Sequence, residues 1–278
     1  MTSPKISGTT QLLAVIGNPV SHTGSPAMQN FMCQTLGLDY VYVAFNIEQG
    51  HLKNAILGIR SLNIVGINVT IPYKEKVIPF LDQLDPLAER IGAVNTIVNQ
   101  NGTLIGYNTD GQGFLVALMK EQQTDVKNKH IVVLGAGGAA KAIVHTLSQK
   151  KPKSMTIANR TPETAIDLAK TCQATGIGIT KELDPFLKNA DIVINTTAVG
   201  MGQLKDQSLV SHYNWVHPHQ LICDIIYNPA ETLFLKQCRL KGAATLNGKG
   251  MLAGQGQIAF ELFTGFCADY NLLKKQLN

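Results

Sequence analysis

A lysine and an aspartate, each placed just after an apolar run, are the side chains best suited to acid–base chemistry. Lys74 follows the run Ile64–Thr70 by way of a proline, and Asp110 follows the run Thr103–Tyr107. Asn, Thr and Ser side chains accompany them at the neighbouring strand ends. Neutral donors and acceptors suit a polyhydroxylated ligand, and a lysine–aspartate pair can transfer its protons. From the residues alone this is a weak hypothesis, because a surface lysine and a helix-capping aspartate give the same pattern.

A glycine-rich turn is the second chemical signal. The hexapeptide Gly135-Ala136-Gly137-Gly138-Ala139-Ala140 follows the β-branched run Ile131–Leu134 and opens a predicted helix, so it fits the pattern G-x-G-x-x-A. Gly135 permits a tight turn, and Gly137 lets the backbone approach a pyrophosphate. The unpaired N–H groups at a helix start attract that charge. The sequence therefore predicts a dinucleotide site here.

The end of the next predicted strand, Met155–Ala158, decides which dinucleotide is expected. NAD sites place an Asp or Glu there to accept a hydrogen bond from the ribose 2′-OH. This chain has Asn159-Arg160-Thr161 instead. A guanidinium suits a 2′-phosphate, through a strong and often bidentate contact. We therefore expect NADP as the cofactor.

Alternating apolar runs and amphipathic stretches must position these residues. The length of 278 residues favours about two domains. In the first half we expect strands at 12–16, 40–45 and 64–70, helices at 25–36, 52–62, 74–81 and 87–91, and a hairpin of 94–98 with 103–107. From His130 onward, strands alternate with helices, which predicts an α/β fold with a parallel, doubly wound sheet.

Composition excludes several classes of protein. The net charge is +5, but only 15% of the residues are charged and no run of five basic residues occurs, which argues against a nucleic-acid binder. Residues 120–160 hold eight Lys and Arg against two Asp and Glu. The basic excess is therefore better interpreted as a local field for a phosphate-rich cofactor.

The cysteines and the apolar runs bear on location. The five cysteines include no C-x-x-C pair, which favours free thiols in a reducing compartment. We find neither a signal peptide nor a run of 18 apolar residues, so we expect no membrane partner and a cytoplasmic location. The segment His217-Pro218-His219 is interpreted as a surface loop, and we expect no metal site.

A set of motifs in a characteristic order then gives the chain a family resemblance. It resembles the shikimate dehydrogenases over essentially its whole length. The motifs are residues 17–26, 68–74, 92–96, 108–111, 135–139, 159–161, 227–229 and 247–252, followed by Gln255. The resemblance implies an N-terminal α/β substrate domain with a mostly parallel sheet (residues 1–111), a Rossmann-type NADP domain (112–249) and a cleft between them, with the last helix within 250–278 packing back on the first domain. It also implies NADP-linked, reversible reduction of 3-dehydroshikimate to shikimate, in aromatic amino-acid biosynthesis.

The resemblance also implies roles for individual residues. Lys74 and Asp110 would form the acid–base pair, which we expect to act as one coupled proton relay. The substrate would be bound by Thr23, Ser25, Asn68, Thr70, Asn95, Asp110, Tyr227 and Gln255. The cofactor would be bound by Gly135, Ala136, Gly137, Gly138, Ala139, Asn159, Arg160, Thr161, Ile225 and Gly248.

Departures from the family pattern leave the substrate and the cofactor less sharply defined. Family members usually carry Ser at the position of Thr23 and a larger residue at that of Gly24, so quinate use stays open. Thr164 stands where NADP-specific members often have a second Arg, so NAD stays possible. The chain could accordingly be a quinate/shikimate dehydrogenase that uses either cofactor, or a catalytically silent metabolite-binding regulator. We expect a monomer or a homodimer.

Overall fold

The computed structural model describes residues 6–277, which form two compact units. One unit runs up to Gly113 and resumes at Ala253, and the other comprises Phe114–Leu252. Both boundaries fall a few residues beyond the expected ones. The reason is that each lies inside a continuous helix, α4 (Asp110–Gln122) or α9 (Lys249–Thr264).

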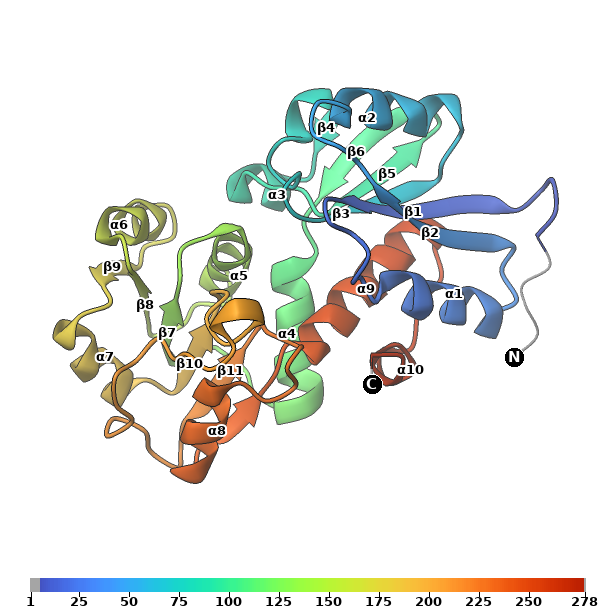
Figure 1. Cartoon of the computed structure of the whole chain (residues 1–278). Coiled ribbons are helices and arrows are strands. Elements are labelled where there is room, and N and C mark those ends of the chain that lie inside the picture. Colours follow the sequence, from blue (N-terminus) through green and yellow to red (C-terminus); the bar gives the residue numbers. More distant parts are fainter. Residues whose placement is uncertain (1–5, 278) are drawn as a thin grey trace. The chain divides into compact units, whose positions relative to one another are not determined.

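The first unit is built on a mixed six-stranded sheet (Figure 1). Its order is β2-β1-β3-β5-β6-β4, in which β2, β1 and β3 are parallel and β5 is antiparallel to both β3 and β6. The strands are β1 (Gln11–Gly17), β2 (Tyr40–Asn46), β3 (Gly66–Val69), β4 (Gln83–Leu84), β5 (Thr96–Gln100) and β6 (Thr103–Tyr107). The helices of this unit are α1 (Ser25–Thr35), α2 (Leu52–Ser61), α3 (Pro86–Ile91) and α10 (Tyr270–Lys275), with a 3₁₀ turn, η1, at Ile78–Phe80.

The apolar run of β1 is explained by burial on both faces. Ala14 and Ile16 join a core cluster with α2, whereas Leu13 and Val15 join another with Phe263 of α9. A parallel strand covered on both sides has no polar face, so its sequence is continuously apolar rather than alternating.

The second unit is built on a fully parallel six-stranded sheet of order β9-β8-β7-β10-β11-β12. Its strands are β7 (His130–Leu134), β8 (Ser154–Asn159), β9 (Thr175–Gly178), β10 (Ile192–Asn195), β11 (Leu221–Asp224) and β12 (Ala244–Leu246), and its helices include α5 (Gly138–Ser148), α6 (Pro162–Lys170), α7 (Asp184–Asn189) and α8 (Leu233–Leu240), with 3₁₀ turns η2 (Lys181–Leu183) and η3 (Gly202–Leu204). From β7 the chain adds β8 and β9 on one side of the sheet, and it then adds β10, β11 and β12 on the other side. Doubly wound sheets bind ligands at this switch in strand order, between β7 and β10.

One expected helix is absent and several short elements were not expected. Residues 74–81 form turns and the short η1, not a helix. Pro79 cannot donate a backbone hydrogen bond, and the Lys74 carbonyl accepts one from Val94 N at 2.7 Å instead of from a helical neighbour. Strands β4, β9 and β12 and helix α10 are two to six residues long, too short to give a periodic pattern.

None of the helices within residues 6–277 combines the length and the hydropathy needed to cross a bilayer. Within the same residues, no group of three or more His, Cys, Asp or Glu side chains is placed to hold a metal ion. The rings of His217 and His219 stack on each other, with centroids 5.7 Å apart.

A buried carboxylate lies at the end of β11, in the second sheet. Asp224 ends β11 beside Asn195 of β10 and is 2% exposed. It accepts hydrogen bonds from Ile226 N (3.0 Å) and from Thr232 Oγ1 (2.8 Å). Burial raises the pKa of Asp224 to about 6, because desolvation outweighs these hydrogen bonds.

This shift predicts a specific pH dependence of stability. The folded chain holds the Asp224 proton more tightly than the unfolded chain does, so this stabilisation is complete below about pH 4 and is lost as the pH rises to about 6. Asp224→Asn cannot titrate. The stability of wild type relative to this variant should therefore fall over that range, by about 3 kcal/mol at most. Thermal unfolding of both proteins across the range measures it, and a constant difference would contradict the prediction.

Candidate active site

Lys74 and Asp110 form an ion pair in the first unit. Lys74 Nζ lies 2.6 Å from Asp110 Oδ2, and the side chains are 27% and 9% exposed. Asp110 opens α4, and its backbone N–H donates to Asn108 Oδ1 at 3.1 Å. The pair is thus fixed on one side by a helix start and on the other by the Lys74–Val94 backbone hydrogen bond. The ion pair joins two residues that follow different strands, because Lys74 comes after β3 and Asp110 after β6.

Asn95 holds the carboxylate of this pair from the other side. Its Nδ2 donates to Asp110 Oδ1 (2.8 Å) and to Thr109 Oγ1 (3.0 Å). Its Oδ1 accepts from Thr109 N (2.8 Å) and from Thr96 Oγ1 (2.9 Å). Both ends of the amide are therefore engaged, which fixes its orientation. Asn95 is 2% exposed, so this orientation is set by the protein.

Asn68 extends the hydrogen-bond network across the sheet. Its Nδ2 donates to Thr96 Oγ1 (3.0 Å) and to Asn95 O (3.2 Å), and its Oδ1 accepts from the Tyr42 hydroxyl (2.7 Å). Asn68 lies on β3 and Thr96 on β5, which are paired antiparallel with these two residues opposite each other. Sheet register therefore brings together polar groups that are distant in the sequence.

The loop before α1 carries the remaining hydroxyls. Thr23 Oγ1 donates to Ser25 Oγ at 3.2 Å and accepts from Ser25 N at 3.3 Å. A Cβ atom at Gly24 would lie 2.9 Å from Leu277 Cδ2. The side chain of Leu277 thus occupies the space beside Gly24.

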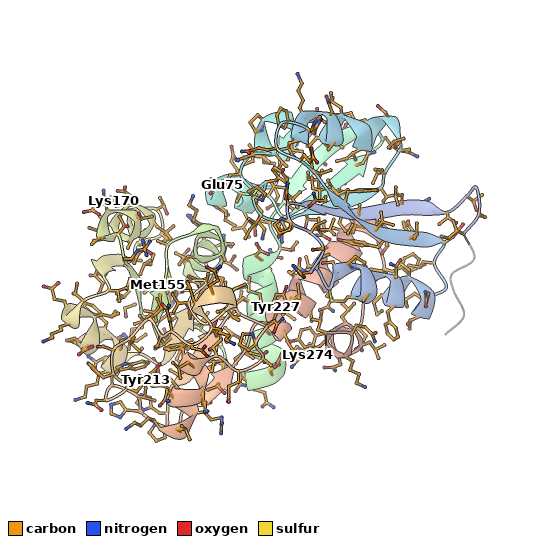
Figure 2. The ribbon with its side chains drawn as sticks, viewed as in Figure 1. Glu75, Met155, Lys170, Tyr213, Tyr227 and Lys274 are labelled. Atoms are coloured by element: carbon orange, nitrogen blue, oxygen red, sulfur yellow. The ribbon has the colours of Figure 1, made fainter. Side chains whose placement is uncertain are left out.

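The other substrate residues expected from the sequence lie as follows. Thr70 follows β3, and its backbone N–H donates to Ile16 O at 2.9 Å. Gln255 lies on α9, and its carbonyl accepts from Thr109 Oγ1 at 3.3 Å. Tyr227 belongs to the second unit and is 40% exposed; it is labelled in Figure 2. Seven of the eight expected substrate residues therefore belong to the first unit.

Three buried members of the network were not expected from the sequence. Tyr42, Thr96 and Thr109 are 1%, 0% and 2% exposed, and each makes at least one side-chain hydrogen bond to Asn68 or Asn95. Thr96 and Thr109 lie inside the motifs 92–96 and 108–111, whereas Tyr42 lies in no motif and its partner is on another strand. The only available signal was a polar residue inside or beside an apolar strand.

The glycine-rich turn lies between β7 and α5. Gly135 has φ +111°, and a Cβ there would lie 2.5 Å from Thr196 Oγ1, so the protein itself requires glycine. Gly137 has φ −81°, and a Cβ at Gly137 or Gly138 would meet no atom within 4 Å. The fold does not require these two glycines. Glycine would be required at these two positions if a phosphate group approached the protein backbone at the helix start.

The residues expected around the rest of the cofactor also belong to the second unit. Asn159 ends β8 and donates from Nδ2 to Thr161 O at 3.1 Å, while Arg160 between them is exposed. Gly248 donates its N–H to Ile226 O at 2.9 Å, and a Cβ there would collide with the Ile225 carbonyl. The segments that hold Ile225 and Gly248 therefore pack backbone to backbone.

Comparison with known proteins agrees with this arrangement. Residues 15–97 match the shikimate dehydrogenase substrate binding domain, and residues 117–229 match the shikimate / quinate 5-dehydrogenase domain. A shikimate dehydrogenase (NADP⁺) of Desulforamulus reducens is 42% identical over 282 aligned residues, covering 99% of this chain and 97% of its own. The chain belongs to the shikimate dehydrogenase family.

Solved structures of shikimate dehydrogenases have the same fold. The Listeria monocytogenes enzyme, in complex with shikimate and NAD, is 34% identical with a TM-score of 0.93, over 100% of this chain and 99% of that one. The Thermus thermophilus enzyme, in complex with NADP(H) and shikimate, is 34% identical with a TM-score of 0.88, over 96% and 98%. The predicted family and the predicted two-domain α/β fold are confirmed.

The two glycines of the turn give a matched pair of variants. Gly135→Ala should lower the melting temperature, because its φ and the contact with Thr196 leave no room for a methyl group. Gly137→Ala should leave the melting temperature unchanged or slightly higher, but weaken NADP binding about tenfold or more, since its methyl group would face the pyrophosphate. Thermal unfolding and fluorescence titration with NADPH measure both. Equal NADPH affinity for Gly137→Ala and wild type would contradict the assignment.

Proposed function

We propose that the chain catalyses the reversible, NADP-dependent interconversion of 3-dehydroshikimate and shikimate, a step of aromatic amino-acid biosynthesis through the chorismate pathway. The observation that carries this is the Lys74–Asp110 pair, held at 2.6 Å within a network of neutral amides and hydroxyls. A polyhydroxylated acid with one oxidisable secondary alcohol needs two kinds of group from a protein. It needs donors and acceptors for its substituents, and a proton-transferring group at one oxygen.

The neutral side chains bind and orient the substrate in this proposal. Thr23 and Ser25 donate hydrogen bonds to its carboxylate. The ring hydroxyls are bound by the other polar residues, which are Asn68, Thr70, Asn95, Asp110 and Gln255. Tyr227 is assigned a place near the carboxylate. Because the amides of Asn68 and Asn95 are already fixed by the protein, little orientational freedom is lost on binding.

The Lys74–Asp110 pair transfers the proton. As the alcohol is oxidised to the ketone, its carbon loses a hydride and its oxygen loses a proton to the pair. Asn95 holds Asp110 Oδ1 while Lys74 holds Oδ2, so the carboxylate cannot rotate away from the lysine. We assign proton transfer to the pair as a unit, since Lys74 Nζ and Asp110 Oδ2 lie 2.6 Å apart and share a hydrogen bond.

The second unit holds NADP in this proposal. When bound, NADP⁺ supplies the oxidant by accepting the hydride from the alcohol carbon. Residues Gly135–Ala139 bind the pyrophosphate at the start of α5, and Asn159, Arg160 and Thr161 bind the 2′-phosphate. The open space beside Gly137 and Gly138 supports this, because the fold does not need glycine there. Ile225 and Gly248 flank the nicotinamide.

We further propose a cytoplasmic location and a monomeric or homodimeric state. The five cysteines are free thiols, four of them buried, which supports a reducing compartment.

Replacing the lysine tests the catalytic assignment. Lys74→Ala should lower kcat by roughly 10²–10⁴-fold, because general acid–base groups contribute that much. The melting temperature is measured alongside and should fall somewhat, because the Asp110 carboxylate, 9% exposed, loses its ion-pair partner. The rate is followed by the absorbance of NADPH. As a control, Lys76→Ala, two residues further along, should leave kcat unchanged. A kcat for Lys74→Ala within a few-fold of wild type would show the assignment to be wrong.

The same assay separates the three candidate activities. Wild type is given shikimate or quinate, each with NADP⁺ or NAD⁺. Turnover only with shikimate and NADP⁺ agrees with the proposal, and equal turnover of quinate indicates a quinate/shikimate dehydrogenase. No turnover in any combination indicates a metabolite-binding regulator.

Replacing the exposed arginine tests cofactor choice. Arg160→Ala should raise KM for NADP⁺ by roughly 10- to 100-fold, the range expected for losing a charge-assisted hydrogen bond. Its KM for NAD⁺ should not change, because NAD⁺ has no 2′-phosphate. If the two KM values rise equally, Arg160 does not select the cofactor.

A further inference from the structure

A series of side-chain hydrogen bonds in the first unit runs from Tyr42 to the Asp110 carboxylate, and Ser25 lies beside its start. Thr23 donates to Ser25, and the Tyr42 hydroxyl donates to Asn68 Oδ1. Burial raises the pKa of the Tyr42 phenol, and the neighbouring Ser25 side chain lowers it, so these two side chains lie next to each other. Tyr42 therefore connects the loop that would bind the carboxylate to the residue that would bind a ring hydroxyl.

The series continues from Asn68 to the catalytic pair. Asn68 Nδ2 donates to Thr96 Oγ1 (3.0 Å), and Thr96 Oγ1 donates to Asn95 Oδ1 (2.9 Å). Asn95 Nδ2 then donates to Asp110 Oδ1 (2.8 Å). Every donor in this series points toward the Asp110 carboxylate. Hydrogen bonds in such a series polarise and strengthen one another.

The backbone of Tyr42 makes two hydrogen bonds to the side chain of Asn30. Its backbone C=O accepts from Asn30 Nδ2 at 2.8 Å, and its backbone N–H donates to Asn30 Oδ1 at 2.8 Å. At this residue of the edge strand β2, one side chain of α1 thus pairs with both the backbone N–H and the backbone C=O. Tyr42 is 1% exposed, and burial raises the pKa of its phenol, so it remains a hydrogen-bond donor.

We propose that Tyr42 is a positioning residue for the substrate, which orients Ser25 and Asn68 together so that the carboxylate and a ring hydroxyl are recognised as one unit. This inference rests on the proposed function. Because Tyr42 is buried, it acts through these two side chains and does not contact the substrate itself. Its loss therefore affects substrate binding more than the chemical step, which depends on Lys74 and Asp110.

Tyr42→Phe removes only the hydroxyl and is the central test. It should raise KM for shikimate roughly threefold to tenfold, in line with the loss of one neutral hydrogen bond. Its kcat should stay within about threefold of wild type, and KM for NADP⁺ should not change. The matched control is Tyr40→Phe, which removes a hydroxyl two residues away on the same strand and should leave all three constants unchanged.

Two further variants make the test independent of how well Tyr42→Phe folds. Asn30→Ala frees the backbone of Tyr42 but keeps its phenol, and should also raise KM for shikimate with kcat unchanged. In the double variant Ser25→Ala/Tyr42→Phe, the increase in KM should be smaller than the product of the two single increases, because the residues act together.

The outcomes separate this inference from the proposed function. If wild type does not turn over shikimate with NADP⁺, the proposed function fails, and the inference fails with it. If wild type is active but Tyr42→Phe matches Tyr40→Phe in KM for shikimate, only the inference fails. It is also overturned if the effects of Ser25→Ala and Tyr42→Phe multiply, or if KM for NADP⁺ rises as much as KM for shikimate.

Discussion

The carboxylate of Asp110 is the acceptor on which the polar interior of the first unit depends. Lys74 Nζ and Asn95 Nδ2 each donate to one of its oxygens, at 2.6 and 2.8 Å. Asn95 in turn is oriented by Thr96 and Thr109, and Thr96 by Asn68. Buried polar groups are costly unless they are paired. The negative charge at the end of the series gives each donor a defined direction, so the side chains proposed to bind substrate are oriented before it arrives.

In the second unit, the main feature is the accessible start of helix α5. Gly135 is needed by the fold, because of its positive φ and its contact with Thr196. Gly137 and Gly138 are not needed by the fold, since a methyl group at either would meet open space. The turn therefore has one glycine that its own geometry requires and two that leave the space needed for the proposed approach of a phosphate. Arg160, exposed at the end of the neighbouring strand, supplies the charge proposed to select the 2′-phosphate.

Much of this arrangement could be predicted from local sequence, and the failures have physical reasons. The strand, the glycine-rich turn and the helix after it are contiguous, so this part of the fold could be predicted from one segment. The helix expected at 74–81 was wrong because Pro79 and a long-range bond to Val94 prevent it. Tyr42 was missed because its partner Asn68 lies on another strand, and the bond from Asn68 to Thr96 likewise joins two strands. Register between strands is not written in either segment alone. Gln255 lies on α9, and its contact with Thr109 joins residues far apart in the sequence, so its proposed role came only from family resemblance.

The most direct test of this account is Asp110→Asn, with kcat and the melting temperature measured on the same preparation. An amide has nearly the shape of a carboxylate, but it presents an NH₂ group to one of the two donors that converge there. The account predicts that kcat for shikimate oxidation falls by roughly 10²-fold or more and that the melting temperature falls as well, because one of the two donors at this position loses its acceptor. A variant that keeps kcat within a few-fold of wild type and melts at the wild-type temperature would contradict the central role of Asp110.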